Sequence, residues 1–407
     1  MQLAGRVRPA LGLLLTAVLA LAPGGEPTPP PEPPPEGLEQ VLGELLPAQP
    51  VAPGVTHREF TTTDAAGQVM GDVVEVALDD PAVRTDLVTA GAVAARASVA
   101  AMANTAGAVA AINGDFFDIG STSAPAGPAV QSTRPLKAAV PQGRRGAPAV
   151  PGAEMDYVFT VGVDRVARVD RLRLDARVDS PHGTLPVVGL NQHAVPVGGI
   201  GIFTRDWGEA DRGQTLCGSD SDRNAPCAPD RVEVLVRDRV VAAVGAPGAG
   251  RLPPNEIALL GREQGAAALR ALQVGDPVQV SYALVPESGV TPQFAVGGSP
   301  ILRDGRPTER LDDRERAPRS AAAHSPDGTR LYLVTVDGRQ DDSVGTTLSE
   351  LSALLAQLGA VDGMNLDGGG SSTLVFRAPG AGEVTIVNDP SDSSARLVPN
   401  GIGVFTG

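Results

Sequence analysis

The stretch that decides the fold is residues 330–376, which reads RLYLVTVDGRQDDSVGTTLSELSALLAQLGAVDGMNLDGGGSSTLVF. It opens with an apolar run at 330–336 that predicts a β-strand. Residues 347–350 form the pattern of a capping box, and leucines at helical spacing follow it, so a helix is expected next. A second apolar run at 361–367 predicts another strand. Strand, helix and strand over this length predict a crossover unit.

Polar residues follow both predicted strands of this unit. If the strands lie parallel in one sheet, their carboxyl ends share one edge, which places Asp337 and Arg339 beside Asn365 and Asp367. Ligands of open sheets bind outside those ends. The sequence therefore predicts a site in which two carboxylates, an amide and a guanidinium converge.

The glycine run after Asp367 strengthens this prediction. Consecutive glycines at 368–370 allow successive backbone N–H groups to turn inward as an anion-binding nest, and Ser371 and Ser372 add hydroxyl groups. Alone, such a run is equally typical of a flexible loop. Its position at the same sheet edge as the carboxylates favours a site.

Outside this unit the pattern is mostly strands and turns. A β-rich middle section is expected over residues 157–290, including a hairpin at 232–244, and short helices are expected at 96–102 and 265–272. The fold class is therefore α+β, with mixed β-sheets and a few helices, in one domain over residues 51–407. The site is expected on the crossover rather than in the middle section.

Composition narrows the function classes. The net charge is −14 and no basic cluster is present, which argues against nucleic acid as a partner. Lys137 is the only lysine, and every other basic residue except the histidines is arginine. Aromatic residues make up 3% of the chain, so the core is expected to be aliphatic.

The N-terminus has the pattern of an export signal. Arg6 and Arg8 precede an apolar run at 10–22, so residues 1–22 are predicted to be a signal peptide and the protein to be secreted or held at the cell surface. The proline-rich residues 23–50 predict a stiff spacer. Two outcomes stay open: cleavage of the signal, or its retention as a tether to a membrane or the cell wall.

The two cysteines, Cys217 and Cys227, are close in sequence. In an exported chain this favours a disulfide; the alternative, half of a metal site, lacks nearby histidines. The four histidines of the chain share no ligand-like spacing. No metal site and no cofactor are therefore predicted.

Several segments in this order resemble the phosphodiester glycosidase family. The stretch 365–373, NLDGGGSST, is the most specific, and the resemblance covers roughly residues 73–405. Ala323 departs from the family pattern, which usually has glycine there. The other matching segments are 111–118, 296–302, 319–321, 334–340, 343–351 and 387–392.

The resemblance implies hydrolysis of a sugar-1-phosphodiester, similar to a GlcNAc-1-phosphodiester, to free sugar and a phosphomonoester. The substrate is expected in cell-wall or other extracellular glycan. Such chemistry needs a carboxylate near the anomeric carbon and donors fixed on the departing phosphate. The candidates are Asp367 and Asp337 for the carboxylate, Arg319 and Arg339 for the phosphate clamp, Asn113 and Asn365 for sugar hydroxyls, and Gly369, Gly370, Ser371 and Ser372 as further donors.

Two other hypotheses stay open at this point. A non-catalytic carbohydrate-binding protein of the cell surface would use the same fold, although a binding module has no need to keep carboxylates and phosphate donors together. A metal-dependent phosphodiesterase that cuts the P–O bond would require a His/Asp ligand cluster, which the sequence lacks.

Overall fold

The computed structural model describes residues 43–144, 150, 152, 154–392 and 394–407. The predicted signal peptide and most of the predicted spacer lie outside these residues. The described residues belong to a compact unit, Gly37–Gly407. The end of the predicted spacer already contains strand: β1 (Glu44–Leu45) and β2 (Gln49–Ala52) both pair with β3. The sheet therefore begins before residue 51.

The largest sheet of the described chain contains both strands predicted within residues 330–366. β21 pairs antiparallel with β22 on one side and with β23 on the other, so β22 and β23 run in the same direction with β21 between them. β2 pairs with β3 off the main path. The remaining strands, in spatial order, are β1, β3 (Val55–Asp64), β4 (Gly67–Ala77), β22 (Arg330–Val336), β21 (Arg319–His324), β23 (Asp362–Asn365), β19 (Ser299–Arg303) and β20 (Arg306–Pro307).

A second sheet contains the last strand of the chain and the strand that precedes the 113–118 segment. All its pairings in the described chain are antiparallel. Its strands, in spatial order, are β25 (Thr385–Ile386), β24 (Leu374–Phe376), β6 (Ala110–Asn113), β26 (Asn400–Thr406) and β5 (Val83–Thr89).

Two further sheets contain the strands of the middle section. One consists of β11 (Gly183–Pro186), β10 (Ala167–Ser180), β9 (Tyr157–Gly162), β18 (Pro292–Gly297), β7 (Ala129–Gln131) and β8 (Arg134–Lys137), with β17 (Gln279–Pro286) on β10. The other consists of β12 (Gly189–Leu190), β13 (Ile200–Phe203), β16 (Glu256–Arg262), β14 (Arg231–Arg237) and β15 (Val240–Gly245).

The predicted hairpin is confirmed, because β14 and β15 pair antiparallel. Asp238 and Arg239, between them, have φ of 50° and 65°. Positive φ at both central residues is the backbone of the type I′ turn that two-residue hairpins favour.

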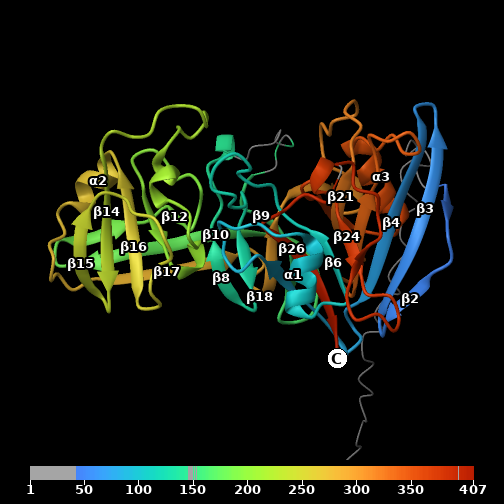
Figure 1. Ribbon diagram of the computed structural model, residues 1–407, viewed down its shortest axis with the longest axis horizontal. Coiled ribbons are helices and arrows are strands. Elements are labelled where there is room, and N and C mark those ends of the chain that lie inside the picture. The colour runs from blue at the N-terminus through green and yellow to red at the C-terminus, as the bar shows by residue number, and fades with distance from the viewer. Residues whose placement is uncertain (1–42, 145–149, 151, 153, 393) are drawn as a thin grey trace, which may run out of the picture. The chain divides into compact units, whose positions relative to one another are not determined.

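Helices are few and short, which confirms the mostly β character of the predicted fold. The capping box is present: the Thr347 N–H donates to Glu350 Oε2 at 2.9 Å, and the Glu350 N–H donates to Thr347 Oγ1 at 3.1 Å. The helix that it starts lies against the largest sheet (Figure 1). In the part of the chain that the structure describes, the helices are α1 (Val99–Ala106), α2 (Gln264–Leu269), α3 (Leu348–Gln357) and the 3₁₀ turns η1 (Gln142–Arg144), η2 (Arg205–Trp207), η3 (Arg212–Leu216) and η4 (Gly369–Ser371).

The bounds of α1 differ from the predicted 96–102. Its N-cap is Ser98, whose side chain accepts the N–H of Ala101, and it ends at Gly107, whose φ of 78° only glycine adopts without strain. Local capping chemistry therefore shifted the helix toward the C-terminus. Among the described residues, no helix is long and apolar enough to cross a membrane.

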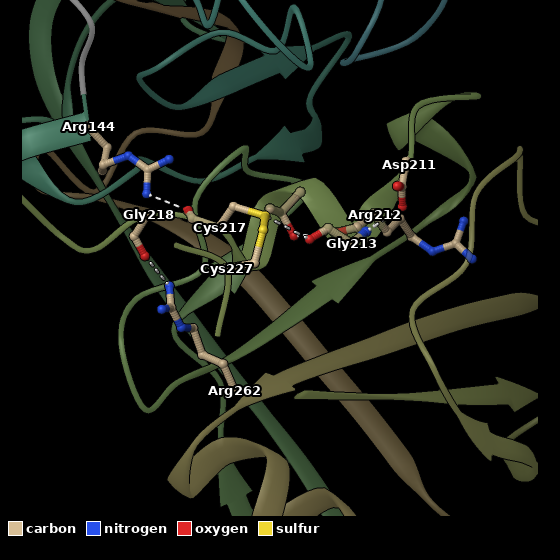
Figure 2. Close-up of a disulfide and its surroundings, with 9 residues drawn as sticks. Arg144, Asp211, Arg212, Gly213, Cys217, Gly218, Cys227 and Arg262 are labelled. Atoms are coloured by element: carbon tan, nitrogen blue, oxygen red, sulfur yellow. Dashed lines mark hydrogen bonds between the residues drawn. A yellow bond between two sulfur atoms is a disulfide. The ribbon is translucent and has the colours of Figure 1, made fainter. Parts of the chain in front are cut away.

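The predicted disulfide is present between Cys217 and Cys227, as Figure 2 shows. The loop that it closes is also held by two arginines: Arg144 Nη1 donates to the carbonyl of Cys217 at 3.0 Å, and Arg262 Nη1 donates to the carbonyl of Gly218 at 2.9 Å. A covalent link and two charged donors thus fix the same turn.

Removing the disulfide is expected to destabilise the fold. For the double variant Cys217→Ser/Cys227→Ser, loop-closure entropy predicts a loss of about 2–3 kcal/mol in the free energy of unfolding. Urea denaturation of the oxidised wild type, the reduced wild type and the variant measures this loss. The reduced wild type and the variant should have the same free energy of unfolding. Equal stability of all three proteins would show that the arginines alone fix the loop.

Candidate active site

The site begins at one edge of the largest sheet. Arg319, at the start of β21, lies opposite Val336, the last residue of β22, and Ala321 lies opposite Asn365, the last residue of β23. Because β22 and β23 run in the same direction, their carboxyl ends and the start of β21 meet at this edge. Residues far apart in sequence thereby become neighbours.

A cavity of about 460 Å³ opens at this edge. Six of the residues predicted from sequence contribute to its wall: Arg319, Arg339, Asn365, Asp367, Gly369 and Gly370. The other lining residues include Phe116, Ser299, Arg310, Asp312, Glu315 and Arg396. The other predicted site residues, Asp337, Asn113, Ser371 and Ser372, do not line it.

Each glycine of the run 368–370 meets a different steric demand. A Cβ on Gly368 would lie 2.7 Å from the carbonyl oxygen of Pro318, and one on Gly370 would collide with the side chain of Asp392. Gly369 has a φ of 60°, and its Cβ would lie 3.2 Å from Arg339 Nη1. The glycines therefore let other chain segments approach closely.

The predicted nest differs from what the structure shows. The N–H of Gly369 donates to Pro318 O at 2.9 Å, and the N–H groups of Ser371 and Ser372 donate to Gly368 O and Gly369 O. The run closes into the 3₁₀ turn η4, so these three N–H groups point into the chain rather than toward an anion. The positive charge of the cavity comes from arginine side chains instead.

Asp367 lines the cavity together with two other acidic residues, Asp312 and Glu315. Its N–H donates to Gly114 O at 2.9 Å, and its carbonyl accepts Asn113 Nδ2 at 2.6 Å, so its backbone is fixed from both sides. The pKa of its carboxyl is raised from 3.8 to about 7. Burial is the largest cause and the nearby Asp115 charge adds to it, whereas a hydrogen bond from Ser371 and the charge of Arg396 oppose the shift. Near neutral pH this carboxyl is poised to gain or lose a proton.

Two predicted clamp residues, Arg319 and Arg339, lie in the wall. Arg319 is held in place because its Nε donates to Thr346 O at 3.0 Å and its Nη2 to Glu315 O at 2.7 Å. Arg339 is half exposed and lies 3.7 Å from the carboxylate of Glu315. The first guanidinium is rigid, and the second is free to turn toward a ligand.

Sequence reasoning missed Arg396. It lines the cavity, its Nη2 donates to Asp392 Oδ2 at 2.9 Å, and its Nη1 approaches Ser371 Oγ at 3.4 Å. It follows the matched segment that ends at Asp392, in a stretch without regular structure. The sequence around Arg396 has no pattern that points to it; only the fold shows that a Cβ on Gly370 would collide with Asp392 and Arg396.

Asn365 presents an amide to the cavity. It is 4% exposed, and its Oδ1 has no hydrogen-bond partner among the described residues. Ser299 of β19 lies directly opposite it in register and lines the same cavity. An unsatisfied buried acceptor beside a serine is suited to a hydroxyl of a bound ligand.

Asn113 lies beneath the cavity instead of in it. It is fully buried, and its Oδ1 accepts both Ser320 Oγ at 2.7 Å and the N–H of Thr373 at 3.0 Å. Its Nδ2 is bonded to the carbonyl of Asp367. Its side chain joins β6, β21 and the glycine segment, so the structure gives it a scaffolding contact in place of the predicted contact with a sugar.

Asp337 also points away from the cavity. Its N–H donates to Met70 O at 2.9 Å, continuing the β4 side of the sheet. Its Oδ1 accepts the N–H of Asp389 at 3.0 Å and Asn388 Nδ2 at 3.3 Å. Burial, and next the charge of Asp72, raise the pKa of its carboxyl to about 7. Through these two hydrogen bonds the Asp337 side chain anchors Asn388 and Asp389, in the segment that leads to Arg396.

Ser371 and Ser372 are buried as well. The Ser371 hydroxyl bonds to the Asp367 carboxyl, and the carbonyl of Ser372 accepts Asn388 Nδ2 at 3.2 Å. Both serines therefore act on Asp367 or on its supporting segment. Within the described ranges, no group of three or more His, Cys, Asp or Glu is arranged to hold a metal ion.

Comparison with known proteins shows which family part of this chain is similar to. Residues 230–405 match the family model of phosphodiester glycosidases. The resemblance to that family is confirmed over these residues. The SPbeta prophage-derived uncharacterized protein YomE of Bacillus subtilis is 32% identical over 125 residues, which is 30% of this chain and 18% of that protein.

Two solved structures share the fold of this chain. A hypothetical protein from Synechocystis has a TM-score of 0.69 at 22% identity, over 88% of this chain and 63% of that one. A protein of Burkholderia pseudomallei described as exported has a TM-score of 0.67 at 19% identity, over 93% of this chain and 99% of that one. The chain thus spans less than two thirds of the Synechocystis protein and under a fifth of YomE.

Proposed function

We propose that the protein is an exported hydrolase that cleaves the glycosidic C–O bond of a sugar-1-phosphodiester. The products are free sugar and a phosphomonoester, and the substrate is a GlcNAc-1-phosphodiester or a similar unit of cell-wall or extracellular glycan. The observation that carries the proposal is the joint presence of Asp367 and four arginines in one cavity. The family match over residues 230–405 supports it.

In this proposal the crossover β22–α3–β23 carries the site, and Asp367 works at the anomeric carbon. It either takes a proton from the attacking water or attacks the carbon directly; in both cases the C–O bond breaks and its electron pair leaves with the phosphate oxygen. A raised pKa suits proton uptake near neutral pH. The anomer that forms first, observed by NMR, distinguishes the two routes.

The arginines stabilise the departing phosphate. Arg319, Arg339 and Arg396 bring positive charge to one wall region, and guanidinium groups bind phosphate oxygens bidentately. Charge on the phosphate grows as the C–O bond breaks, so donors fixed in advance stabilise the transition state more than the ground state. Asn365 and Ser299 are the proposed partners of sugar hydroxyls.

Export is supported by three separate features. The sequence begins with the pattern of a signal peptide, the Cys217–Cys227 disulfide is typical of oxidising compartments, and a protein of the same fold is described as exported. The proline-rich segment before the fold suits a spacer from a membrane or wall.

The test of the proposal is isotope incorporation. Incubation of the full chain with UDP-N-acetylglucosamine in H₂¹⁸O is expected to place the label in the sugar, because water attacks carbon. Label in the phosphate would mean P–O cleavage and would overturn the mechanism. Saturable binding with no turnover, of this probe and of a GlcNAc-phosphodiester, would favour the carbohydrate-binding alternative.

The proposed phosphate clamp, Arg319 and Arg339, leads to a separate prediction. Arg339→Lys is expected to raise KM about tenfold or more and to lower kcat as well, since an ammonium group is a point charge and does not replace a bidentate fork. Arg314→Lys is the matched control, because the Arg314 side chain is 93% exposed and does not line the cavity. Steady-state kinetics measure both, and equal KM values for the two variants would make Arg339 structural.

A further inference from the structure

A fully buried lysine lies behind the cavity. Lys137, at the end of β8, donates from one atom, Nζ, to three carbonyl oxygens: Ala126 at 3.1 Å, Ala138 at 2.6 Å, and Gly127. A neutral amine has two hydrogens and an ammonium has three. Three acceptors around one nitrogen therefore require the charged form.

Composition points to the same conclusion independently. Lys137 is the only lysine among the 33 lysine and arginine residues of the chain. A guanidinium spreads its donors over three nitrogens in a plane and is unable to direct three hydrogens from one atom. A chain that otherwise uses arginine thus has a lysine at a place whose geometry requires an ammonium group.

Asp115 is an acidic residue bonded to the same glycine, Gly127, as Lys137. Asp115 is 2% exposed, and its Oδ2 accepts the N–H of Gly127 at 2.6 Å, while the carbonyl of Gly127 accepts Lys137. A Cβ on Gly297 would lie 2.5 Å from Asp115 Oδ2, so that glycine leaves room for the carboxylate. Gly127 therefore links the two charges through its own N–H and C=O groups.

Asp115 is coupled to Asp367 on its other side. Gly114, its neighbour in the chain, accepts the N–H of Asp367, and the charge of Asp115 raises the pKa of Asp367. Burial lowers the pKa of Lys137 to about 7, and Asp115 opposes that shift. The remaining charged or titratable groups near these three are Arg396 beside Asp367, and His193, Asp118 and Arg144 on the far side of Lys137.

We propose that Lys137 and Asp115 form a buried positioning pair, which fixes a negative charge behind Asp367 and so sets how readily Asp367 takes up a proton. The importance of this pair for catalysis rests on the proposed function, but the pairing itself does not. Neither residue lines the cavity, and both act through Asp367.

The single lysine makes the pairing directly measurable. In the full chain with a lysine-free tag, ¹³Cε-lysine labelling gives one NMR signal, whose shift with pH reports the charge of Lys137. We expect the ammonium form at pH 6, and a pKa lowered by about one unit or more in Asp115→Asn, which keeps an oxygen for the Gly127 N–H.

Asp118→Asn, in the same segment, is the matched control and should leave that pKa within a few tenths of wild type. A neutral amine in wild type at pH 6 overturns the pairing even if Asp115→Asn does not fold. An unchanged pKa in folded Asp115→Asn overturns it as well.

The influence on Asp367 is tested without turnover. The difference in unfolding free energy between a protein and its Asp367→Asn variant, followed against pH, reports the pKa of Asp367 by linkage. Repeating this measurement in the Asp115→Asn background should move that pKa down by about one unit. An unmoved pKa overturns the proposed role.

Kinetic measurements distinguish failure of the proposed role of Asp115 toward Asp367 from failure of the proposed function. With UDP-N-acetylglucosamine as probe, Asp115→Asn should lower kcat about tenfold with KM nearly unchanged, and shift the acidic limb of the kcat profile to lower pH. If the wild type turns over no probe, the proposed function fails while the NMR and linkage results still decide on the pair. If the wild type turns over and the limb does not move in the variant, the role toward Asp367 is overturned.

Discussion

Asp367→Asn is expected to lower kcat for glycosyl phosphodiester hydrolysis by about 10²–10⁴-fold, the usual contribution of a positioned acid or base. KM should change little, because the arginines that hold the phosphate remain. Asp313→Asn is the control, since the Asp313 side chain is 77% exposed and does not line the cavity. A variant within tenfold of wild type would remove Asp367 from the chemistry.

The same substitution is expected to stabilise the protein at high pH. The folded pKa of Asp367, about 7, lies above the ordinary 3.8, so the folded state holds the proton more tightly than the unfolded state. Wild type therefore loses stability as pH rises through this window, and a neutral asparagine does not.

The size of this gain follows from the shift. After allowance for its partial exposure to solvent, Asp367→Asn should gain about 1–3 kcal/mol at pH 8 and only a small fraction of that at pH 4. Urea denaturation at the two pH values measures it. Lower activity with higher stability is the signature of a functional carboxyl in an unfavourable site; loss of stability at pH 8 would mean that the carboxylate is structural.

Local patterns explain why most of the secondary structure was predictable. Alternating apolar residues predicted the strands, and the Thr347–Glu350 pair predicted the start of α3. These signals lie within a few residues of the elements that they describe. The length of the strand, helix and strand made a shared edge for β22 and β23 an expectation if the two strands were parallel, although the sequence did not show that β21 lies between them.

The roles of individual side chains were harder to predict, because distant segments decide them. Asp337 and Asp367 both precede glycine at the end of a strand, yet one meets Asn388 and Asp389 and the other faces the cavity. The glycine run after Asp367 is a local difference between them, but it does not reveal which of the two side chains the fold brings to the cavity.

The same reason explains the residues that sequence reasoning missed. Arg396 has no pattern around it, and Asp115 becomes important only through its neighbours in space. The single lysine was visible in the composition, but its meaning depends on three carbonyls that the fold brings to one atom.

A pair of variants tests Asp337, which the sequence placed in the chemistry and the structure uses as an anchor. Asp337→Asn keeps an oxygen for the Asp389 N–H, so we expect kcat/KM within about threefold of wild type. Asp337→Ala removes that acceptor from the Asp389 N–H and from Asn388 Nδ2, which keeps its bond to the Ser372 carbonyl, at a cost of about 1–3 kcal/mol in stability. It should also lower kcat/KM about 10–100-fold, since the segment that carries Arg396 loses its anchor.

The two variants are needed because pH profiles alone would not separate the carboxyls. Asp337 and Asp367 both have pKa values raised to about 7, so either would produce an activity limb near neutral pH. If Asp337 only anchors, Asp337→Asn keeps that limb and Asp367→Asn abolishes it. If Asp337→Asn loses activity as strongly as Asp367→Asn while its unfolding curve matches wild type, Asp337 takes part in the reaction and the cavity must rearrange to reach it.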